Sequence, residues 1–347
     1  MGLITMKVPV REASINPDHW YGVALSSQIG ESPLGITLWE QPIVLFRDLN
    51  RRICALEDCC PHRFVKLSRG KVVNGELECT YHGWCIDGGG KCSKIPYLES
   101  GQSLPTRAIK TYPVIEKDGF VWLFLGNPDL ATKIKRFTIP EWDSLNYISS
   151  VTEFTVNCHF SFLIENLMDM YHGHLHQNYQ AWAQPQLKSI ETNEQEVIAN
   201  YDAQSYYKID RIWSVSQLFL PWLRQLHPAP LQVRYNYPHW RASLGDDFRI
   251  YCLFAPIDRN HTRAFLLHFT SLESFSNLHK LPYCFRLWVK NTFHNSAKFL
   301  LNNLVKQDIL MLKDEQNAYD REGRKPLEIN RTLIAVQKLI ESQANRG

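Results

Sequence analysis

Two cysteines and two histidines lie close together in the first quarter of the chain. Cys60 and His62 form one pair, and Cys79 and His82 form a second pair after sixteen intervening residues. Thiolates and neutral imidazoles are the usual protein ligands of zinc ions and of some iron–sulfur clusters. The two short arms therefore predict a metal site in this part of the chain.

Two kinds of metal site use this set of ligands. A structural zinc site places two cysteines and two histidines around a single ion. A Rieske [2Fe–2S] cluster binds one iron through two cysteines and the other through two histidines, which raises its reduction potential. Each arm here carries one cysteine and one histidine, which favours the Rieske cluster. A zinc-stabilised interaction module remains the alternative.

A second group of candidate ligands consists of three histidines within five residues, His172, His174 and His176. Residues 159–177 have the composition of a helix. On a helix, Asp169, His172 and His176 share one face, and the remaining histidine lies on another. Two imidazoles at positions i and i+4 can bind one metal ion. We therefore expect His172 and His176 to bind a metal. A surface helix with scattered histidines is the alternative.

Two histidines leave a metal site incomplete, and a 2-His-1-carboxylate triad is the usual site of non-haem Fe(II). The candidate carboxylate is Asp308, which falls at position i+7 of an apolar stripe in a late helical segment. The apolar members of this stripe are Leu301, Leu304, Val305, Met311 and Leu312. A carboxylate among buried apolar side chains is costly unless it is paired or bound to a metal. We expect Asp308 to be the third ligand, and an ion pair with an Arg or Lys is the alternative.

The N-terminal part of the chain has the pattern of a small antiparallel β domain. Ile43–Arg47 is an apolar, β-branched run, and Arg52–Leu56 is expected to be its hairpin partner. Asp118–Gly119 lies between two further apolar runs and predicts a second hairpin, because both residues tolerate positive φ. We expect this Rieske-type domain to span residues 1–140.

The remainder of the chain, residues 141–347, mixes helical and strand patterns and is expected to be a second domain that holds His172, His176 and Asp308. Strands are predicted at 248–256 and 263–270, and a long helix from Pro282 to Gly323. Helices packed over an antiparallel sheet are the natural architecture for this pattern. The fold class predicted for the whole chain is therefore α+β.

The composition is that of a soluble globular protein. The 347 residues are 44% hydrophobic and 21% charged, and a net charge of +3 is too small to indicate a nucleic-acid partner. There is no apolar run long enough for a membrane span and no secretory signal. Nine cysteines without a disulfide pattern suit a reducing compartment, so we expect a cytoplasmic protein.

The motif CPHR…CTYHGWCIDGGGKC followed by KIPYL, which begins at Cys60, resembles the Rieske domain of the Rieske non-haem iron oxygenases. The resemblance to the α subunit of these enzymes extends over residues 17–320. The spacing Asp169-x-x-His172-x₃-His176 is similar to that of the carbazole- and 2-oxoquinoline-type oxygenases. Those members are homotrimers without a β subunit, and their branch includes alkaloid hydroxylases and O-demethylases.

The resemblance implies a role for each candidate ligand. The ligands it implies for the [2Fe–2S] cluster are Cys60, His62, Cys79 and His82. The ligands it implies for a mononuclear Fe(II) are His172, His176 and Asp308. Asp169 is implied to bridge a cluster histidine of one subunit, His82, and an iron histidine of its neighbour, His172. Electrons would then cross the subunit interface, which makes the homotrimer part of the mechanism.

The function implied is an O₂-dependent oxygenase that hydroxylates or oxidatively demethylates a small organic substrate, aromatic or alkaloid-like. Electrons would come from NAD(P)H through a ferredoxin or a reductase, since the sequence has no dinucleotide fingerprint of its own. An excess of basic residues around the ligand loops suits an acidic ferredoxin. These residues are Arg63, Lys66, Arg69, Lys71, Lys91 and Lys94. A Rieske electron-transfer protein without catalytic activity is the alternative.

Overall fold

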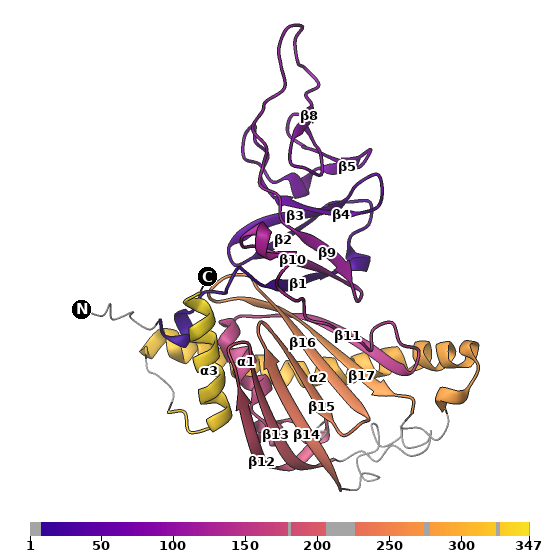
Figure 1. The fold of residues 1–347 in the computed structure, drawn as a ribbon, viewed down its shortest axis with the longest axis vertical. Helices are drawn as coiled ribbons and strands as arrows, with labels where there is room; N and C mark the ends of the chain where they lie inside the picture. Colours follow the sequence, from indigo (N-terminus) through magenta and orange to yellow (C-terminus); the bar gives the residue numbers. More distant parts are fainter. Residues whose placement is uncertain (1–7, 180–181, 206–225, 274–277, 324–326, 347) are drawn as a thin grey trace. The chain divides into compact units, whose positions relative to one another are not determined.

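The computed structural model describes residues 8–179, 182–205, 226–273, 278–323 and 327–346. Its contacts divide the chain into two compact units (Figure 1). One unit is Asn16–Arg136, and the other joins the described residues before Asn16 to Phe137–Arg346. The N-terminal segment up to Ile15 thus groups with the second unit, whereas we expected the first domain to begin at residue 1 and to end at 140.

The Asn16–Arg136 unit is built from three antiparallel sheets. In spatial order, the first contains β1 (Trp20–Leu25), β10 (Phe120–Phe124) and β9 (Val114–Lys117). The second contains β2 (Leu34–Leu38), β3 (Gln41–Arg47) and β4 (Ile53–Glu57). The third contains β5 (Lys71–Val73), β6 (Glu76–Glu78), β7 (Cys85–Ile86) and β8 (Cys92–Lys94).

Both hairpins expected in this unit are confirmed. β3 pairs with β4 in an antiparallel register that places Leu45 opposite Ala55. β9 and β10 are joined by Asp118 and Gly119, whose φ angles of 52° and 70° are those of a type I′ turn. All five residues of β10 are buried, which explains why its sequence is a continuous apolar run rather than an alternating one.

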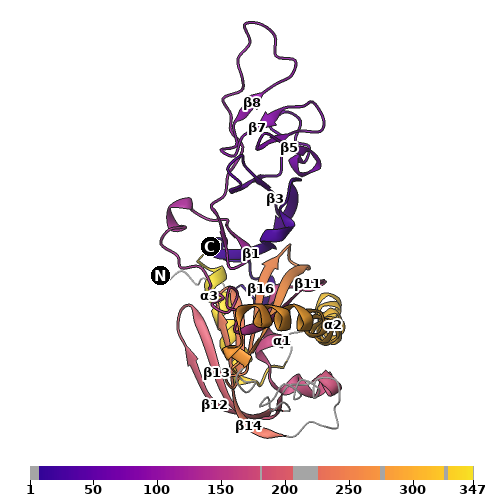
Figure 2. The same cartoon turned by 90° about the vertical axis from the view of Figure 1, so that its right-hand side faces the viewer.

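The second unit contains a seven-stranded antiparallel sheet (Figure 2). Its strands, in spatial order, are β11 (Tyr147–Val156), β17 (Thr262–Ser271), β16 (Phe248–Pro256), β15 (His239–Leu244), β14 (His227–Asn236), β13 (Glu196–Ser205) and β12 (Trp182–Thr192). The two strands predicted from the sequence correspond to the adjacent strands β16 and β17. The mixed α+β fold class is confirmed.

Three α-helices lie among the described residues of this unit. α1 (Phe160–Met168) contacts both α2 (Tyr283–Glu322) and α3 (Arg331–Ala344). α2 packs against β11, α1 against β14 and α3 against β13, so helices cover the sheet along its width. The long helix predicted from Pro282 to Gly323 is confirmed. It ends where Gly323 adopts the left-handed conformation, with φ 59°.

The continuous helix predicted for residues 159–177 is wrong. α1 ends at Met168, because Asp169 adopts an extended conformation with φ −87° and ψ 109°. The Asp169 carboxylate then accepts a hydrogen bond from the Tyr171 N–H (2.9 Å), a local turn that competes with helix continuation. The chain resumes as a 3₁₀ helix, η5, over Tyr171–Tyr179.

Candidate metal centres

The first candidate ligand loop, which follows β4, is closed by two backbone hydrogen bonds. The Cys60 N–H donates to the Val65 carbonyl (2.9 Å), and the Phe64 N–H donates to the Cys60 carbonyl (2.9 Å). Phe64 has a φ of 58°, which turns the chain back toward its start. His62 therefore projects from a tight loop whose first residue is the cysteine.

The second candidate loop connects β6 to β7 and closes in the same way. The Cys79 N–H donates to the Trp84 carbonyl (2.8 Å), and the Gly83 N–H donates to the Cys79 carbonyl (3.0 Å). Gly83 has a φ of 69°, and a Cβ on it would lie 2.9 Å from Pro96, so both its conformation and its packing require glycine. His82 and the first loop's histidine thus project from matching loops.

The two cysteines belong to the apolar core of this unit. Cys60 is 1% exposed and Cys79 is 2% exposed, and both pack with Leu56, Leu67 and Leu77. Burial and the adjacent Cys79 thiol raise the pKa of Cys60 to about 11. A buried thiol of this kind becomes a thiolate when it binds a metal, because the metal charge replaces the lost solvation.

The two histidines lie against each other on the outer side of these cysteines. The ring centroids of His62 and His82 are 4.6 Å apart. Trp84 stacks on His62 with centroids 4.6 Å apart and planes 3° apart, and the Trp84 indole N–H donates to the Tyr97 hydroxyl (2.7 Å). The indole therefore fixes the plane of one imidazole.

This pairing discriminates between the two metal sites that the sequence left open. The four residues do not form a group whose ligand atoms all lie within 4.8 Å of one another. The cysteines instead pair with each other, and so do the histidines. Two separate pairs suit a cluster with two irons, whereas a tetrahedral zinc site needs all four donors around one ion.

The second candidate centre brings together His172, His176 and Asp308. The ligand atoms of these three residues all lie within 4.8 Å of one another. Asp308 Oδ1 lies 3.7 Å from His172 Nε2 and 3.5 Å from His176 Nε2. These distances are too long for hydrogen bonds. The three ligand atoms therefore leave room for an ion between them.

The same distances fit a single metal ion. Two donors that each lie about 2.1 Å from one ion are about 3.0 Å apart at a 90° angle and about 3.6 Å apart at 120°. The donor set of two imidazoles and one carboxylate is the one preferred by non-haem Fe(II). The three side chains present therefore fit a mononuclear iron.

Three elements hold these side chains. η5 carries both histidines, and α2 carries Asp308. The Gln307 side-chain oxygen lies 3.1 Å from His176 Nδ1, so that nitrogen donates the hydrogen bond and Nε2 is left as an acceptor for a metal. Asn166, from α1, donates from Nδ2 to Asp308 Oδ1 (3.3 Å).

Burial makes this centre unfavourable without a metal. Asp308 is 6% exposed and His176 is 1% exposed. Desolvation raises the pKa of Asp308 despite the two histidines, and desolvation also lowers the pKa of His172. A bound cation would reverse the penalty on the carboxylate and would favour neutral imidazoles.

The apolar stripe used to select Asp308 is only partly correct. Val305 and Leu312 are buried beside it, at 5% and 1% exposure. Met311 is 44% exposed, so its assignment to the buried face is wrong. The side chain of Leu301 lies outside the described residues.

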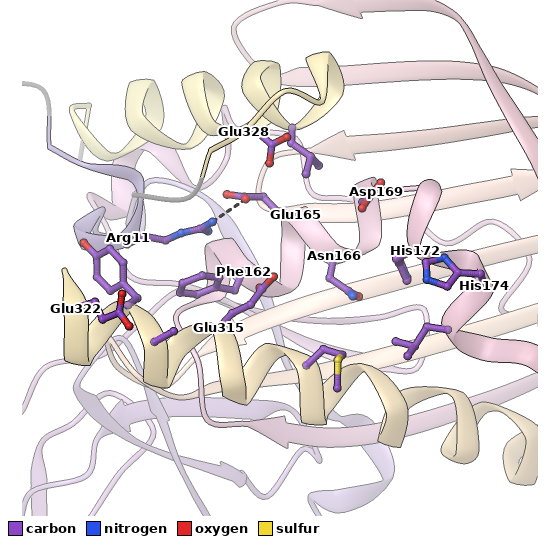
Figure 3. Close-up of a pocket in the computed structure, with 15 residues that line it drawn as sticks. Arg11, Phe162, Glu165, Asn166, Asp169, His172, His174, Glu315, Glu322 and Glu328 are labelled. Atoms are coloured by element: carbon purple, nitrogen blue, oxygen red, sulfur yellow. Dashed lines mark hydrogen bonds and ion pairs between the residues drawn. The ribbon is translucent and has the colours of Figure 1, made fainter. Parts of the chain in front are cut away.

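A pocket of about 590 Å³ opens next to this centre (Figure 3). Asn166, Asp169 and His172 lie toward one end of it, and Arg11 lies toward the other. Its remaining polar walls are mostly acidic and include Glu315, Glu322 and Glu328. Asp169, which the family resemblance implied to be a bridging carboxylate, lines this pocket and is not part of the three-residue group.

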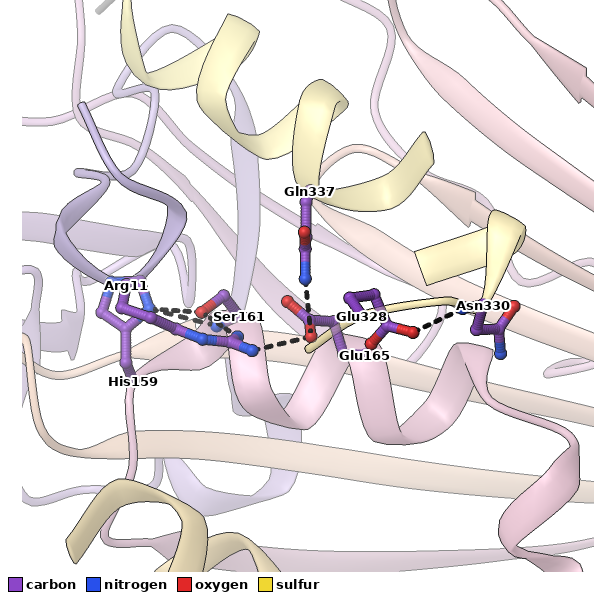
Figure 4. A network of polar contacts seen from close by, with 7 residues as sticks. All are labelled: Arg11, His159, Ser161, Glu165, Glu328, Asn330 and Gln337. Carbon is purple, nitrogen blue, oxygen red and sulfur yellow. Dashed lines mark hydrogen bonds and ion pairs between the residues drawn. The ribbon is translucent and has the colours of Figure 1, made fainter. Parts of the chain in front are cut away.

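A buried polar network, which includes the pocket residues Arg11 and Glu165, supports α1 (Figure 4). Arg11 donates to Ser161 Oγ (2.8 Å) and pairs with Glu165 (2.7 Å), which also accepts from Gln337 of α3 (3.2 Å). The Arg11 guanidinium also lies 3.7 Å from the centre of the Phe162 ring. This network fixes the helix that precedes Asp169.

Sequence reasoning missed the residues that support the ligands. These residues reach the site from distant parts of the chain. Gln307 contacts His176, Arg11 contacts Glu165 of α1, and Asn330 contacts Asp169. Gln307 precedes Asp308, and this adjacency is the one local signal that could have identified it.

Comparison with known proteins identifies both units. Residues 19–113 match the family model of the Rieske [2Fe-2S] domain, and residues 156–346 match the vanillate O-demethylase oxygenase C-terminal domain. The 4β-methylsterol monooxygenase of Methylococcus capsulatus is 31% identical in an alignment of 345 positions that covers 95% of this chain and 89% of that protein.

Two further similarities are one to part of dicamba O-demethylase in sequence and one to dicamba monooxygenase in fold. The oxygenase component of dicamba O-demethylase from Stenotrophomonas maltophilia is 36% identical over 181 residues, 52% of this chain and 51% of that protein. The crystal structure of dicamba monooxygenase bound to dicamba shares the fold, with a TM-score of 0.74 at 23% identity over 96% of this chain and 98% of that one.

The second family match covers the unit that holds His172, His176 and Asp308. An electron-transfer protein without a catalytic domain is therefore excluded. A zinc-stabilised interaction module is excluded by the match of the first unit. The chain belongs to the Rieske non-haem iron oxygenases, and it is an oxidoreductase of the monooxygenase type.

Proposed function

We propose that this enzyme hydroxylates a methyl group carried by a ring-containing substrate, with an iron held by His172, His176 and Asp308. The observation that carries the assignment of the iron site is the convergence of these three donors within 4.8 Å. We further propose that a [2Fe–2S] cluster is held by Cys60, His62, Cys79 and His82. Bound at these sites, the iron supplies O₂ activation and the cluster supplies electrons.

The residues of the chain prepare the iron site. Gln307 keeps the proton of His176 on Nδ1, which directs Nε2 toward the metal. Asn166 holds Asp308 in one orientation through its hydrogen bond to Oδ1. Because His176 and Asp308 are almost completely buried, bulk water is excluded from that side of the site.

The substrate class rests on the relatives. Their names specify a 4β-methylsterol, two O-demethylation substrates (dicamba and vanillate) and toluene-4-sulfonate. All of these carry a methyl group on a ring or on an oxygen attached to one. Insertion of one oxygen atom into a methyl C–H bond gives an alcohol, and the second oxygen leaves as water after uptake of two electrons and two protons. An O-methyl product then releases formaldehyde.

Labelled oxygen tests this proposal. Dithionite-reduced enzyme would be exposed to ¹⁸O₂ with vanillate, toluene-4-sulfonate or 4-methylsterol as probes. We expect ¹⁸O in the CH₂OH group of a C-methyl probe, or formaldehyde from an O-methyl probe. Oxygen inserted into a ring carbon with the methyl group intact would contradict the proposal.

We propose that electrons come from NAD(P)H through a separate ferredoxin or reductase. Six basic side chains around the candidate ligand loops are exposed and can attract an acidic donor. They are Arg63, Lys66, Arg69, Lys71, Lys91 and Lys94. Reduction by an acidic ferredoxin should therefore slow as the salt concentration rises, because screening weakens long-range attraction.

We propose that the active form is a homotrimer in which Asp169 of one subunit links the two centres of neighbouring subunits. The support is that Asp169 lines a pocket beside His172. Asp169→Asn should keep both metals and slow reoxidation of the reduced cluster. Light scattering should give three chains per particle.

We also place the enzyme in a reducing compartment, the cytoplasm. The support is that none of the nine cysteines forms a disulfide. In the described part of the chain, no helix has the length and apolar character needed to cross a membrane.

A further inference from the structure

Asn330, which precedes α3, makes three polar contacts through its side chain and its backbone N–H. Its side-chain oxygen accepts a hydrogen bond from the Thr332 N–H (3.0 Å), which makes it the N-cap of α3. Its side-chain nitrogen donates to Asp169 Oδ1 (3.2 Å). Its backbone N–H donates to the Glu328 carboxylate (2.6 Å; Figure 4). One residue therefore connects the start of α3 to the end of α1.

These partners determine the orientation of the Asn330 amide. The Thr332 N–H needs an acceptor, and the Asp169 carboxylate needs a donor. The opposite orientation would place an N–H₂ against an N–H and a carbonyl oxygen against a carboxylate oxygen. The amide nitrogen therefore faces Asp169, and the helix cap and the carboxylate contact depend on each other.

The two carboxylate oxygens of Asp169 differ in the hydrogen bonds that they accept. Oδ1 accepts from the Tyr171 N–H (2.9 Å) and from Asn330. Oδ2 accepts no hydrogen bond from the residues that the structure describes. Two donors on one oxygen fix the rotation of the carboxylate, so Oδ2 is held in a defined direction at the pocket that Asp169 lines.

α3 is in turn rigidly held. The Thr332 hydroxyl lies 3.0 Å from the Tyr201 hydroxyl in a buried contact with β13. Gln337, one turn further on, donates to Glu165 of α1 (3.2 Å). The N-terminus of α3 is therefore a fixed support from which Asn330 reaches Asp169.

We infer that Asn330 is a positioning residue for electron transfer, which fixes Asp169 Oδ1 so that Oδ2 is presented to the neighbouring subunit's cluster histidine. This inference rests on the proposed role of Asp169. It assigns a function in the reaction to the start of the C-terminal helix, which lies 161 positions from Asp169 in the sequence.

Two substitutions separate this role from simple helix capping. Asn330→Asp keeps a side-chain oxygen that caps α3 as well as Asn does, but it places a second carboxylate against Asp169. Asn330→Ala removes both the cap and the donor. Asn127→Asp is the matched control, because Asn127 also caps a short helix through the Asp129 N–H (3.0 Å) and lies in the other unit.

The experiment would follow three properties of the full-length enzyme: melting temperature, iron content, and the rate at which the reduced cluster is reoxidised. Reoxidation would be started by adding O₂ together with one substrate. That substrate is whichever of vanillate, toluene-4-sulfonate and 4-methylsterol gave the most product in the ¹⁸O₂ experiment. We expect Asn330→Asp to melt no lower than Asn330→Ala, to keep its iron, and to reoxidise at least tenfold more slowly than the wild type. Asn330→Ala should melt about 2–4 °C lower and reoxidise at an intermediate rate.

A normal reoxidation rate in Asn330→Asp, together with a slow rate in Asp169→Asn, would overturn the inference and leave the proposed function intact. Equal rates in the wild type and Asp169→Asn would instead refute the role of Asp169 itself. A slow rate in Asn127→Asp would show that the effect is not specific to the contact with Asp169, and it would also overturn the inference.

Discussion

The loops that carry Cys60 and Cys79 close through hydrogen bonds between residues at most five positions apart. The centre at His172 and His176 depends on α2, and the contact between His176 and Gln307 joins residues 131 positions apart. Both candidate centres include two histidines. The first is assembled from short loops, whereas the second depends on the packing of elements that are far apart in the sequence.

This difference predicts which structural movements would disturb each centre. A local centre tolerates small movements of distant elements, because its loops carry their own geometry. A centre built from α1, η5 and α2 changes whenever these elements shift, even when no ligand is altered. The four variants below test this comparison, from the largest expected effect to the smallest.

Asp308→Ala should abolish product formation and leave the Rieske cluster intact. Loss of this carboxylate removes one of three donors, so the loss of activity should exceed the roughly 100-fold seen when residues that merely support metal ligands are changed. Iron content and the EPR spectrum of the reduced cluster would be measured together. Asp314→Ala, an exposed residue on the same helix, is the control. A changed cluster spectrum would show that the two centres are not independent.

Cys79→Ser should have the reciprocal effect. The cluster and its colour should be lost, because a buried hydroxyl is a poor substitute for a thiolate ligand, while one iron per chain remains at the second centre. Cys85→Ser is the control, since this nearby buried thiol is outside the proposed ligand set. Retention of a normal Rieske spectrum in Cys79→Ser would contradict the assignment.

Arg11→Met should destabilise the second unit without touching a ligand. The side chains of Arg11 and Glu165 are 6% and 9% exposed, so removal of the cation leaves a buried, unpaired carboxylate. We expect the free energy of unfolding to fall by about 3–5 kcal/mol in urea. Arg321→Met, whose side chain is 74% exposed, should change it by less than about 0.5 kcal/mol.

The added variant Glu165→Leu should restore much of the stability lost in Arg11→Met, because no unpaired charge then remains. If Arg11→Met unfolded at the same urea concentration as the wild type, this network would not be what supports α1.

Gln307→Leu should weaken iron binding and leave the cluster unchanged. Without the Gln307 oxygen, His176 is free to rotate and to move its proton to Nε2. We expect the dissociation constant for Fe(II) to rise about 10- to 100-fold, measured by equilibrium dialysis under anaerobic conditions. Lys306→Leu, the adjacent exposed residue, is the control. Equal affinity in both variants would show that the hydrogen bond does not orient the histidine.

The same contrast explains what the sequence could predict. The hairpin at Asp118–Gly119 and the long helix that ends at Gly323 were predictable, because local turn and cap chemistry determines them. His172 and His176 were paired by a helix that does not exist there, and η5 brings them together instead. The candidate ligands were therefore selected by residue type and spacing rather than by a correct backbone.

The supporting residues could not be predicted because their partners are far away in the sequence. Asn330 has the ordinary composition of a helix cap, and nothing around it indicates a contact with Asp169. Arg11 precedes the Asn16–Arg136 unit in sequence but packs on α1 of the second unit. Long-range polar contacts of this kind leave no periodic pattern in the chain.

The central claim is that one chain holds two different iron centres, and metal analysis combined with EPR tests it most directly. The enzyme would be purified anaerobically and measured before and after dithionite. The account predicts about three irons per chain and a Rieske signal on reduction, two irons in the cluster and one at Asp308. Two irons that do not rise to three on addition of Fe(II), or zinc in a colourless protein, would contradict it.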